Sequence, residues 1–258
     1  MAGRVTSERA DGIGWIVFDH EARRNAITAE MWDRIPEVAA DLDADPAVRV
    51  VVMRGAGDVA FVSGADISEF EAQRSGPEAR AYDERNARAF AALSTLGKPL
   101  IASIHGFCVG GGCAIALCAD LRFAADDAVF AIPAARLGLG YSASGLESLV
   151  RVVGLPAAKE IFFTARRFDA REARDMGLVN RVLPKHELDD AVRATAQQIA
   201  ENAPLTLASA KLAFAQMGRD PGSRDPEAVS AAIARCYASD DYAEGVRAFL
   251  EKRSPVFR

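Results

Sequence analysis

Two short glycine-containing segments are the strongest candidates for chemistry in this sequence. The first reads FVSGADI at residues 61–67, and the second, GFCVGGGCA at 106–114, holds three consecutive glycines. Glycine lets a backbone approach a bound group closely, and a helix N-terminus carries unpaired N–H groups with partial positive charge. Two such N–H groups converging on one point would form an oxyanion hole. A triple glycine equally marks tight packing of a helix on a strand, so spacing alone leaves both interpretations open.

Neither segment matches a nucleotide-binding fingerprint, because the P-loop lysine is absent and the glycine spacing differs from that of a dinucleotide site. The net charge of −5, from 31 basic and 36 acidic residues, argues against nucleic acid as a partner. It still permits an anionic ligand, since a few local Lys or Arg residues suffice for phosphates.

The four cysteines predict no metal site. Cys108, Cys113 and Cys118 are spaced by five residues within an apolar run, and no histidine completes a zinc site. We therefore expect reduced cysteines packed as small hydrophobic residues, with Cys236 as the fourth. Reduced cysteines fit an intracellular compartment, and the first 19 residues lack the apolar core of a signal peptide. We predict a cytoplasmic protein with no metal and no membrane partner.

The two glycine segments lie in the first half of the chain, where both strands and helices are predicted, whereas only helices are predicted from residue 155 onward. Residues 100–119 carry no formal charge over the length of a membrane span, but the glycines and His105 within them favour a buried strand, a turn and a buried helix. Thr28 is the expected N-cap of a helix at 29–44. Strands are predicted at 14–18, 48–53, 100–104, 121–124 and 128–132, and helices at 29–44, 77–96, 156–163, 170–176, 186–202, 204–217, 226–238 and 241–253.

The two glycine segments, together with flanking motifs, resemble the crotonase (enoyl-CoA hydratase/isomerase) superfamily. FVSGADISEF at 61–70 is similar to its first turn and GFCVGGGCAIALCAD at 106–120 to its glycine helix. The similarity continues through PAARLGLG at 133–140 and DYAEGVRAFLEKRSPVF at 241–257, and it begins at a basic-Asn-Ala element. This resemblance covers nearly the whole chain, in order.

The resemblance implies an α/β fold, a crotonase-like ββα superhelix at residues 1–202 followed by a helical trimerisation and CoA-contacting region at 203–258. It implies an acyl-CoA substrate, no cofactor apart from the CoA of that substrate, and a homotrimer or a dimer of trimers. The N–H groups of Ala65 and Gly111 would point at the thioester oxygen, where charge rises as an enolate forms.

The family's CoA contacts map onto several positions of this sequence. The implied substrate-binding residues are Arg23, Arg24, Ala26, Gly64, Asp66, Ile67, Ala114, Ala134, Phe249 and Lys252. Ser68 stands where many members carry a lysine. Solvated surface charge is the alternative for the two arginines, and a turn or cap role is the alternative for Asp66. We expect Asp120 and His105 to be structural.

The two glutamates of the family's hydratases are absent, because Ala114 and Ala134 occupy their positions. Hydration needs an activated water and a proton delivered to Cα, which that carboxylate pair provides. Ser142 stands where dehalogenases and hydroxyacyl-CoA hydrolases of the family carry an aspartate, and a serine without a partner is neither base nor nucleophile near pH 7. These replacements favour a reaction that needs no paired-glutamate base.

Near the expected pocket remain Arg136, Tyr141, Ser142, Ser144 and Glu147. Tyr141 after the LGLG run resembles a stretch of methylmalonyl-CoA decarboxylases, although Ala65 replaces a histidine of those enzymes. Decarboxylation needs an oxyanion hole but no base, so we favour it. The alternatives are a hydratase or isomerase that uses Glu147, which could instead interact with a helix dipole, and a non-catalytic acyl-CoA-binding subunit.

Overall fold

A computed structural model describes residues 2–69 and 78–257. Two β-sheets form its centre. The larger sheet has the order β1-β2-β3-β5-β7-β10, with β1 antiparallel to β2 and the other neighbours parallel. Its strands are β1 (Arg4–Ala10), β2 (Ile13–Asp19), β3 (Val50–Gly55), β5 (Leu100–Ile104), β7 (Leu121–Ala125) and β10 (Arg181–Leu183).

The smaller sheet carries the glycine segments. Its order is β4-β6-β8-β9, with β4, β6 and β8 parallel and β9 antiparallel to β8. Parallel strands end at the same edge, so the segments that follow β4, β6 and β8 meet there. These strands are β4 (Ala60–Val62), β6 (Phe107–Val109), β8 (Val129–Ala131) and β9 (Phe168–Asp169).

Alternation along the strands divides the core into two layers. On β2, Ile16 packs in the larger hydrophobic cluster and Trp15 in a second cluster on the opposite face of the sheet. Side chains of a strand alternate between faces, which accounts for the division. Helix α7 (Leu188–Ala200) covers the second face with Leu188, Val192 and Ala196, spaced at one helical turn. Both faces of the large sheet are therefore buried.

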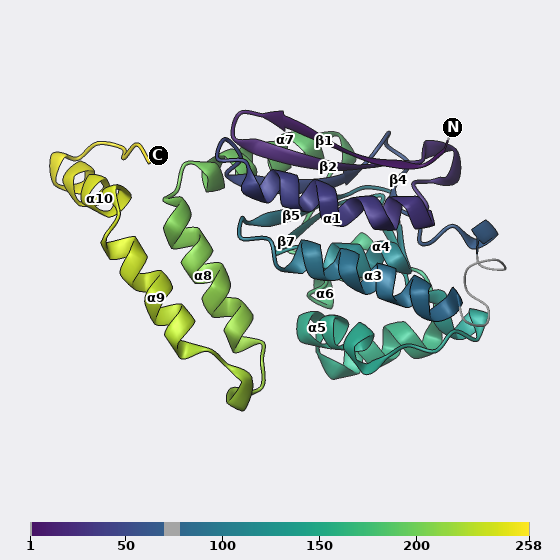
Figure 1. Cartoon of the computed structure of the whole chain (residues 1–258). Helices are drawn as coiled ribbons and strands as arrows, with labels where there is room; N and C mark the ends of the chain where they lie inside the picture. The colour runs from purple at the N-terminus through teal and green to yellow at the C-terminus, as the bar shows by residue number, and fades with distance from the viewer. Residues whose placement is uncertain (1, 70–77, 258) are drawn as a thin grey trace.

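The remaining helices surround the sheets (Figure 1). Thr28 accepts a hydrogen bond from the Met31 N–H and caps α1 as expected. One expectation was inexact, because α5 begins well before residue 156 and bends at Gly154 (φ 74°). The predicted helix 77–96 corresponds to α3, and its first residue, Pro77, lies outside the described residues. The helices are α1 (Ala29–Ala44), α3 (Glu78–Ser94), α4 (Gly111–Leu117), α5 (Ala143–Thr164) and α6 (Ala170–Asp175).

Three C-terminal helices extend away from the sheets (Figure 1). They are α8 (Pro204–Met217), α9 (Pro226–Tyr237) and α10 (Asp240–Glu251). Together they line an apolar groove of about 700 Å³, with Ile233, Tyr237 and Phe249 among its exposed walls. The mixed α/β class and the helical C-terminal region were both expected from the sequence; the domain limit at residue 202 stays a prediction.

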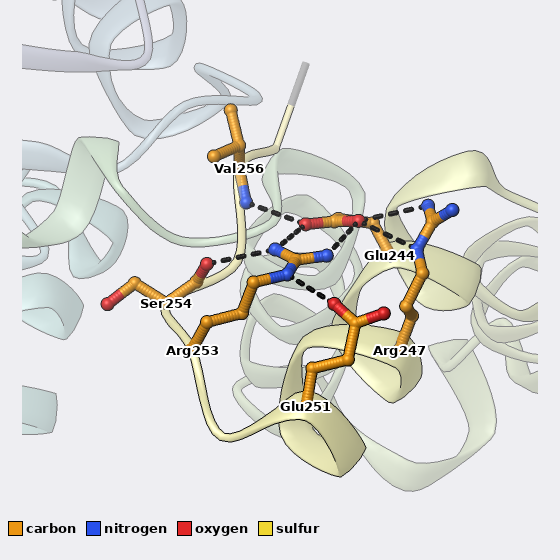
Figure 2. Close-up of polar contacts among 6 residues, drawn as sticks. All are labelled: Glu244, Arg247, Glu251, Arg253, Ser254 and Val256. Atoms are coloured by element: carbon orange, nitrogen blue, oxygen red, sulfur yellow. Dashed lines mark hydrogen bonds and ion pairs between the residues drawn. The ribbon is translucent and has the colours of Figure 1, made fainter.

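The chain after α10 folds back on that helix (Figure 2). Arg253 donates to both oxygens of Glu244, at 2.6 and 3.0 Å, and the Val256 N–H donates to the same carboxylate at 3.2 Å. Hydrogen bonds from Arg253 lower the pKa of Glu244 to about 2. The network holds Phe257 against Gly245, where it forms part of the groove wall.

None of the helices within the described ranges combines the length and the hydropathy of a membrane span. The cysteines are free: Cys108 and Cys113 are buried and the other two half-buried. Burial raises the pKa of the Cys108 thiol and raises that of Cys118 to about 11, so both stay protonated near neutral pH. These residues are packed as small hydrophobic groups, in keeping with the sequence prediction.

Candidate active site

The two glycine segments lean directly on each other. A Cβ atom added at Gly112 would lie 2.1 Å from the Val62 carbonyl oxygen, and one added at Gly64 would lie 3.3 Å from that of Val109. Gly64 also has φ of 115°, which side chains rarely adopt. Each segment therefore needs its glycine because the strand that carries the other segment passes within contact distance.

The Ala65 N–H points away from the neighbouring segment that contains Ile27. Ile27 donates its N–H to the Gly64 carbonyl at 2.8 Å and accepts from the Asp66 N–H at 2.9 Å. Because Ile27 bonds to the residues on both sides of Ala65, the Ala65 N–H points to the opposite side. A Cβ added at Gly111 would lie 3.7 Å from the Ala65 nitrogen, so the two backbones are adjacent.

Gly111 presents its N–H at the first turn of α4. Gly110 precedes it with φ of 53° and ψ of −112°, and donates its own N–H to the Ala131 carbonyl at 2.8 Å. N–H groups of a first helical turn have no partner within the helix. Within residues 2–69 and 78–257, neither the Ala65 nor the Gly111 N–H donates a hydrogen bond. Two free donors thus lie side by side.

Trp32 supports this arrangement, and sequence reasoning did not single it out. Its ring lies beneath Gly111, 3.4 Å from where a Cβ would stand, and its Nε1 donates to the Tyr82 hydroxyl at 3.2 Å. Trp32 is 1% exposed. An aromatic residue at a buried helix position is too common to mark a support of this kind in sequence.

Asp66 acts as a turn residue in this structure. Its Oδ1 accepts hydrogen bonds from the Ser68 N–H at 3.0 Å and the Ser68 hydroxyl at 2.7 Å. Burial opposes ionisation of Asp66, but these hydrogen bonds outweigh it and lower the pKa. Ile67, next to it, is 62% exposed. Phe70, the last residue of the first motif, lies outside the described residues.

The basic-Asn-Ala element touches the first glycine segment. Ser63 donates its hydroxyl to the Arg23 carbonyl and its N–H to the Arg24 carbonyl, both at 3.1 Å. Asn25 fixes the element from below, because its amide donates to the Ala56 and Ala60 carbonyls. Ala26 is buried, whereas both arginines are exposed. The main chain of this element therefore lies against the first glycine segment, and both arginine side chains are at the surface.

Ala114 and Ala134, the two alanines predicted to replace glutamates, lie on the segments that follow β6 and β8. Ala114 is half-buried in the first turn of α4, and its N–H donates to the Gly110 carbonyl. Ala134 is 3% exposed, in the 3-10 helix Pro133–Leu137 that follows β8. Both positions carry methyl groups, and their match to the glutamate positions of the family's hydratases stays a prediction from the sequence.

The loop after β8 leads into α5. Ser142 caps that helix and accepts from the Gly145 N–H at 3.2 Å, while Ser144 lies in the first turn. Tyr141 packs edge-on against Phe162, with ring centroids 5.1 Å apart. Glu147 is exposed and pairs with Arg151 at 2.6 Å. Tyr141 packs against the larger hydrophobic cluster, whereas Arg136 is exposed.

Phe249 lies on α10 and Lys252 directly follows that helix, away from the glycine segments of their own chain (Figure 1). Phe249 is 83% exposed, and Lys252 ends the helix in a left-handed conformation, with φ of 54°. No group of three potential metal ligands gathers anywhere in the described residues.

The fold is thus a two-sheet α/β fold with adjacent backbone donors after β4 and β6. Residues 8–258 match the family model described as enoyl-CoA hydratase/isomerase, and the chain belongs to that family. Crotonyl-CoA hydratase of Syntrophomonas wolfei is 33% identical, over 98% of this chain and 97% of that protein.

Two further relatives extend the comparison. Carnitinyl-CoA dehydratase of Escherichia coli O157:H7 is 34% identical over 92% of this chain and 91% of its own. A crystal structure of an enoyl-CoA hydratase/isomerase family protein from Hyphomonas neptunium superimposes with a TM-score of 0.94, at 36% identity, covering 98% of this chain and 97% of that one. The crotonase fold class is confirmed by this likeness.

Proposed function

We propose that this protein binds an acyl-CoA thioester and stabilises its enolate between the N–H groups of Ala65 and Gly111. The carrying observation is that these two adjacent donors have no partner among the described residues. Negative charge on the thioester oxygen rises as the enolate forms, so fixed donors stabilise the transition state more than the substrate. Each donor of this kind contributes about 3 kcal/mol in other enzymes.

Decarboxylation of a malonyl-type thioester suits the residues around these donors. The bond between Cα and the carboxylate breaks, its electron pair moves into the thioester to form the enolate, and CO2 leaves. Water then protonates Cα. The step needs no base, which agrees with alanine at positions 114 and 134. Methyl groups there disfavour the charged carboxylate and favour neutral CO2.

Addition of water to an enoyl-CoA is the second candidate, since one relative is named a crotonyl-CoA hydratase. It would need an acid or base to replace the two glutamates. Glu147 is the first acid after Ala134 along the chain, just beyond the LGLG loop, but its exposed pairing with Arg151 supports a structural role. A hydratase mechanism would therefore depend on a water chain or on movement of α5.

Mass spectrometry of CoA products tests the two reactions. We expect methylmalonyl-CoA to lose CO2 and crotonyl-CoA to stay unchanged. Rapid gain of water by crotonyl-CoA would contradict the proposal, and its loss in Glu147→Gln would identify the acid. Tight acyl-CoA binding without turnover of a broad panel would indicate a non-catalytic subunit.

The donor itself can be tested by a matched pair of substitutions. Gly111→Pro removes the N–H at a first helical position, where proline is tolerated, whereas Gly111→Ala keeps it. We expect the proline variant to lose about 10²–10³ in kcat relative to the alanine variant. Equal rates would exclude this donor.

We further propose that the chain assembles as a homotrimer or a dimer of trimers. The exposed apolar side chains of α8, α9 and α10 support this, because Phe214, Tyr237, Phe249 and Leu250 are each more than 60% exposed and gathered apolar side chains of this kind mark interaction surfaces. Phe249 and Lys252 would then reach the acyl-CoA of a neighbouring copy.

A further inference from the structure

Arg122 is a buried cation on β7 that has no carboxylate bound to it. Its side chain is 7% exposed, and arginine keeps its charge at neutral pH. No ion pair among residues 2–69 and 78–257 includes Arg122, because Asp120, two positions before it, pairs with Lys211 at 2.7 Å. Burial lowers the pKa of Arg122, and the nearby charge of Asp120 opposes this shift. Burial of an unpaired charge is costly, so the contacts of the guanidinium must compensate for it.

These contacts are main-chain carbonyls at the end of α4. The Nη1 atom donates to the Ala119 carbonyl and, at 3.5 Å, to that of Ala116, while Nε donates to the Leu178 carbonyl at 2.7 Å. The last carbonyls of a helix lack partners within it and carry partial negative charge, which a cation stabilises. Leu178 lies just before β10, which pairs with β7. One guanidinium therefore joins the end of α4 to the segment that enters the large sheet.

The helix α4 connects this contact to the proposed oxyanion hole. It has seven residues, and a rise of about 1.5 Å per residue makes it about 10 Å long. So short a helix moves as one body, because its backbone hydrogen bonds link successive turns. At its first turn the Val62 carbonyl leaves no room beside Gly112. A shift of the helix at Ala116 would therefore also displace the N–H of Gly111.

We propose that Arg122 is a positioning residue that fixes the Gly111 N–H relative to the Ala65 N–H. This inference rests on the proposed oxyanion hole and adds the side chain that holds one of its donors from the far end of α4. Arg122 acts through the helix and does not bind the substrate. A misplacement of about 1 Å can cost about 10²-fold in rate, so loss of the guanidinium should impair the donor even in a folded protein.

Asn180 provides a matched control. Its side chain accepts from the Arg122 N–H at 2.8 Å, and its own N–H donates to the Arg122 carbonyl at 2.8 Å. Asn180→Ala removes a hydrogen bond to the main chain of Arg122 but leaves the guanidinium contacts in place. We expect this variant to melt at a lower temperature without moving Gly111. It therefore separates a loss of stability from a loss of position.

Infrared spectroscopy of a bound thioester measures the position of the donors. The probe is propionyl-CoA with carbon-13 at its carbonyl, whose stretching frequency falls when donors bond to the oxygen. We expect the full shift in the unmodified protein and in Asn180→Ala, and at most half of it in Arg122→Met. Arg122→Lys should be intermediate, because an ammonium lacks the planar fork that reaches both α4 and Leu178.

A thioether ligand shows whether the rest of the binding site is intact. Propyl-CoA has no carbonyl oxygen, so isothermal titration should give all four proteins the same affinity for it, within about twofold. Melting curves confirm that the variants are folded, and Arg122→Lys decides the question if Arg122→Met does not fold.

Each remaining outcome counts against a stated part of the proposal. A folded Arg122 variant with the full carbonyl shift overturns the positioning role and leaves the proposed function intact. A shift in Asn180→Ala as small as that in Arg122→Met also overturns the role, because lost stability would then explain both. Failure of the unmodified protein to bind propionyl-CoA, or to shift its carbonyl frequency, overturns the proposed oxyanion hole itself.

Discussion

At the scale of single residues, the two segments require glycine because close backbone contacts leave no room for a side chain, and backbone flexibility is only part of the reason. The Val62 carbonyl fills the space that a side chain at position 112 would need. We expect Gly112→Ala to lower the free energy of unfolding by about 1–3 kcal/mol and to reduce turnover, because α4 must move away from β4. Urea unfolding measures the first effect. Gly222→Ala, in open space, should leave the unfolding midpoint unchanged.

His105 makes stability depend on pH. Its side chain is 7% exposed and its Nε2 has no hydrogen-bond partner in the described residues. Burial lowers its pKa, while the charges of Asp189, Lys185, Asp127 and Asp58 act on it in opposing directions. The unfolded chain therefore binds a proton more readily than the folded one.

The contribution of neutral, buried His105 to the free energy of unfolding should be fully present above the pKa of the unfolded chain, about 6.5. It should decrease as the pH drops below that value, because the unfolded chain then binds a proton. Urea midpoints between pH 7.5 and 5.5 measure this slope. We expect His105→Leu to flatten it and His186→Gln, at an exposed position, to leave it unchanged. An equal slope in the His105 variant would contradict the assignment.

Reasoning from single residues of the sequence identified the two glycine segments, but it did not identify the side chains that hold the surrounding structure in place. Ala65 and Gly111 stand in recognisable motifs, and the structure places them together, though their role stays a prediction. Asn25, Trp32 and Arg122 act through partners 31 or more positions away along the chain, such as Ala56 for Asn25, Tyr82 for Trp32 and Leu178 for Arg122. Single-sequence patterns report periodicity over one or two turns, so contacts of this range leave no mark in them.

At the scale of elements, one ion pair joins α8 to the sheets. The Lys211 ammonium donates to Asp120 at 2.7 Å and to the Lys98 carbonyl at 2.8 Å, and Asp120 also accepts from the Leu100 N–H. The Lys211 side chain is 16% exposed. Asp120 is thus structural, as the sequence suggested, and it ties the start of β5 to the C-terminal helices.

We expect Lys211→Gln to loosen α8 and to speed limited proteolysis between residues 200 and 204. Hydrogen bonds to charged groups contribute about 1.5–3 kcal/mol, and partial solvent screening places this one at the lower end. Lys159→Gln, on the exposed side of α5, is the control. Identical cleavage rates in both variants would show that packing alone holds α8.

Elements with strong local signals were predictable. The strand at 100–104 and the helices at 29–44 and 204–217 have the expected bounds. Strand β1 was missed, because its exposed polar residues gain their order from pairing with β2. The start of α5 was missed because a serine cap and a mid-helix glycine resemble a loop in sequence.

At the scale of the whole molecule, the groove of α8, α9 and α10 carries the proposed assembly. We expect light scattering to give three or six chains per particle. Ile233→Asp, which places a charge in the groove wall, should yield monomers, because burial of an unpaired charge is costly. A monomeric unmodified protein would contradict the proposed trimer.

Because the two proposed oxyanion donors, the N–H groups of Ala65 and Gly111, are main-chain atoms, the proposed stabilisation of charge does not depend on the side chains that would transfer protons. Side chains at 114 and 134 can change without altering the hydrogen bonds that hold either donor. Substitutions at positions 114 and 134 can therefore add or remove acid–base side chains, while the fold keeps both backbone donors in place. On this view Ala114→Glu with Ala134→Glu should confer measurable hydration of crotonyl-CoA, and the reverse path describes how a hydratase ancestor could have lost it.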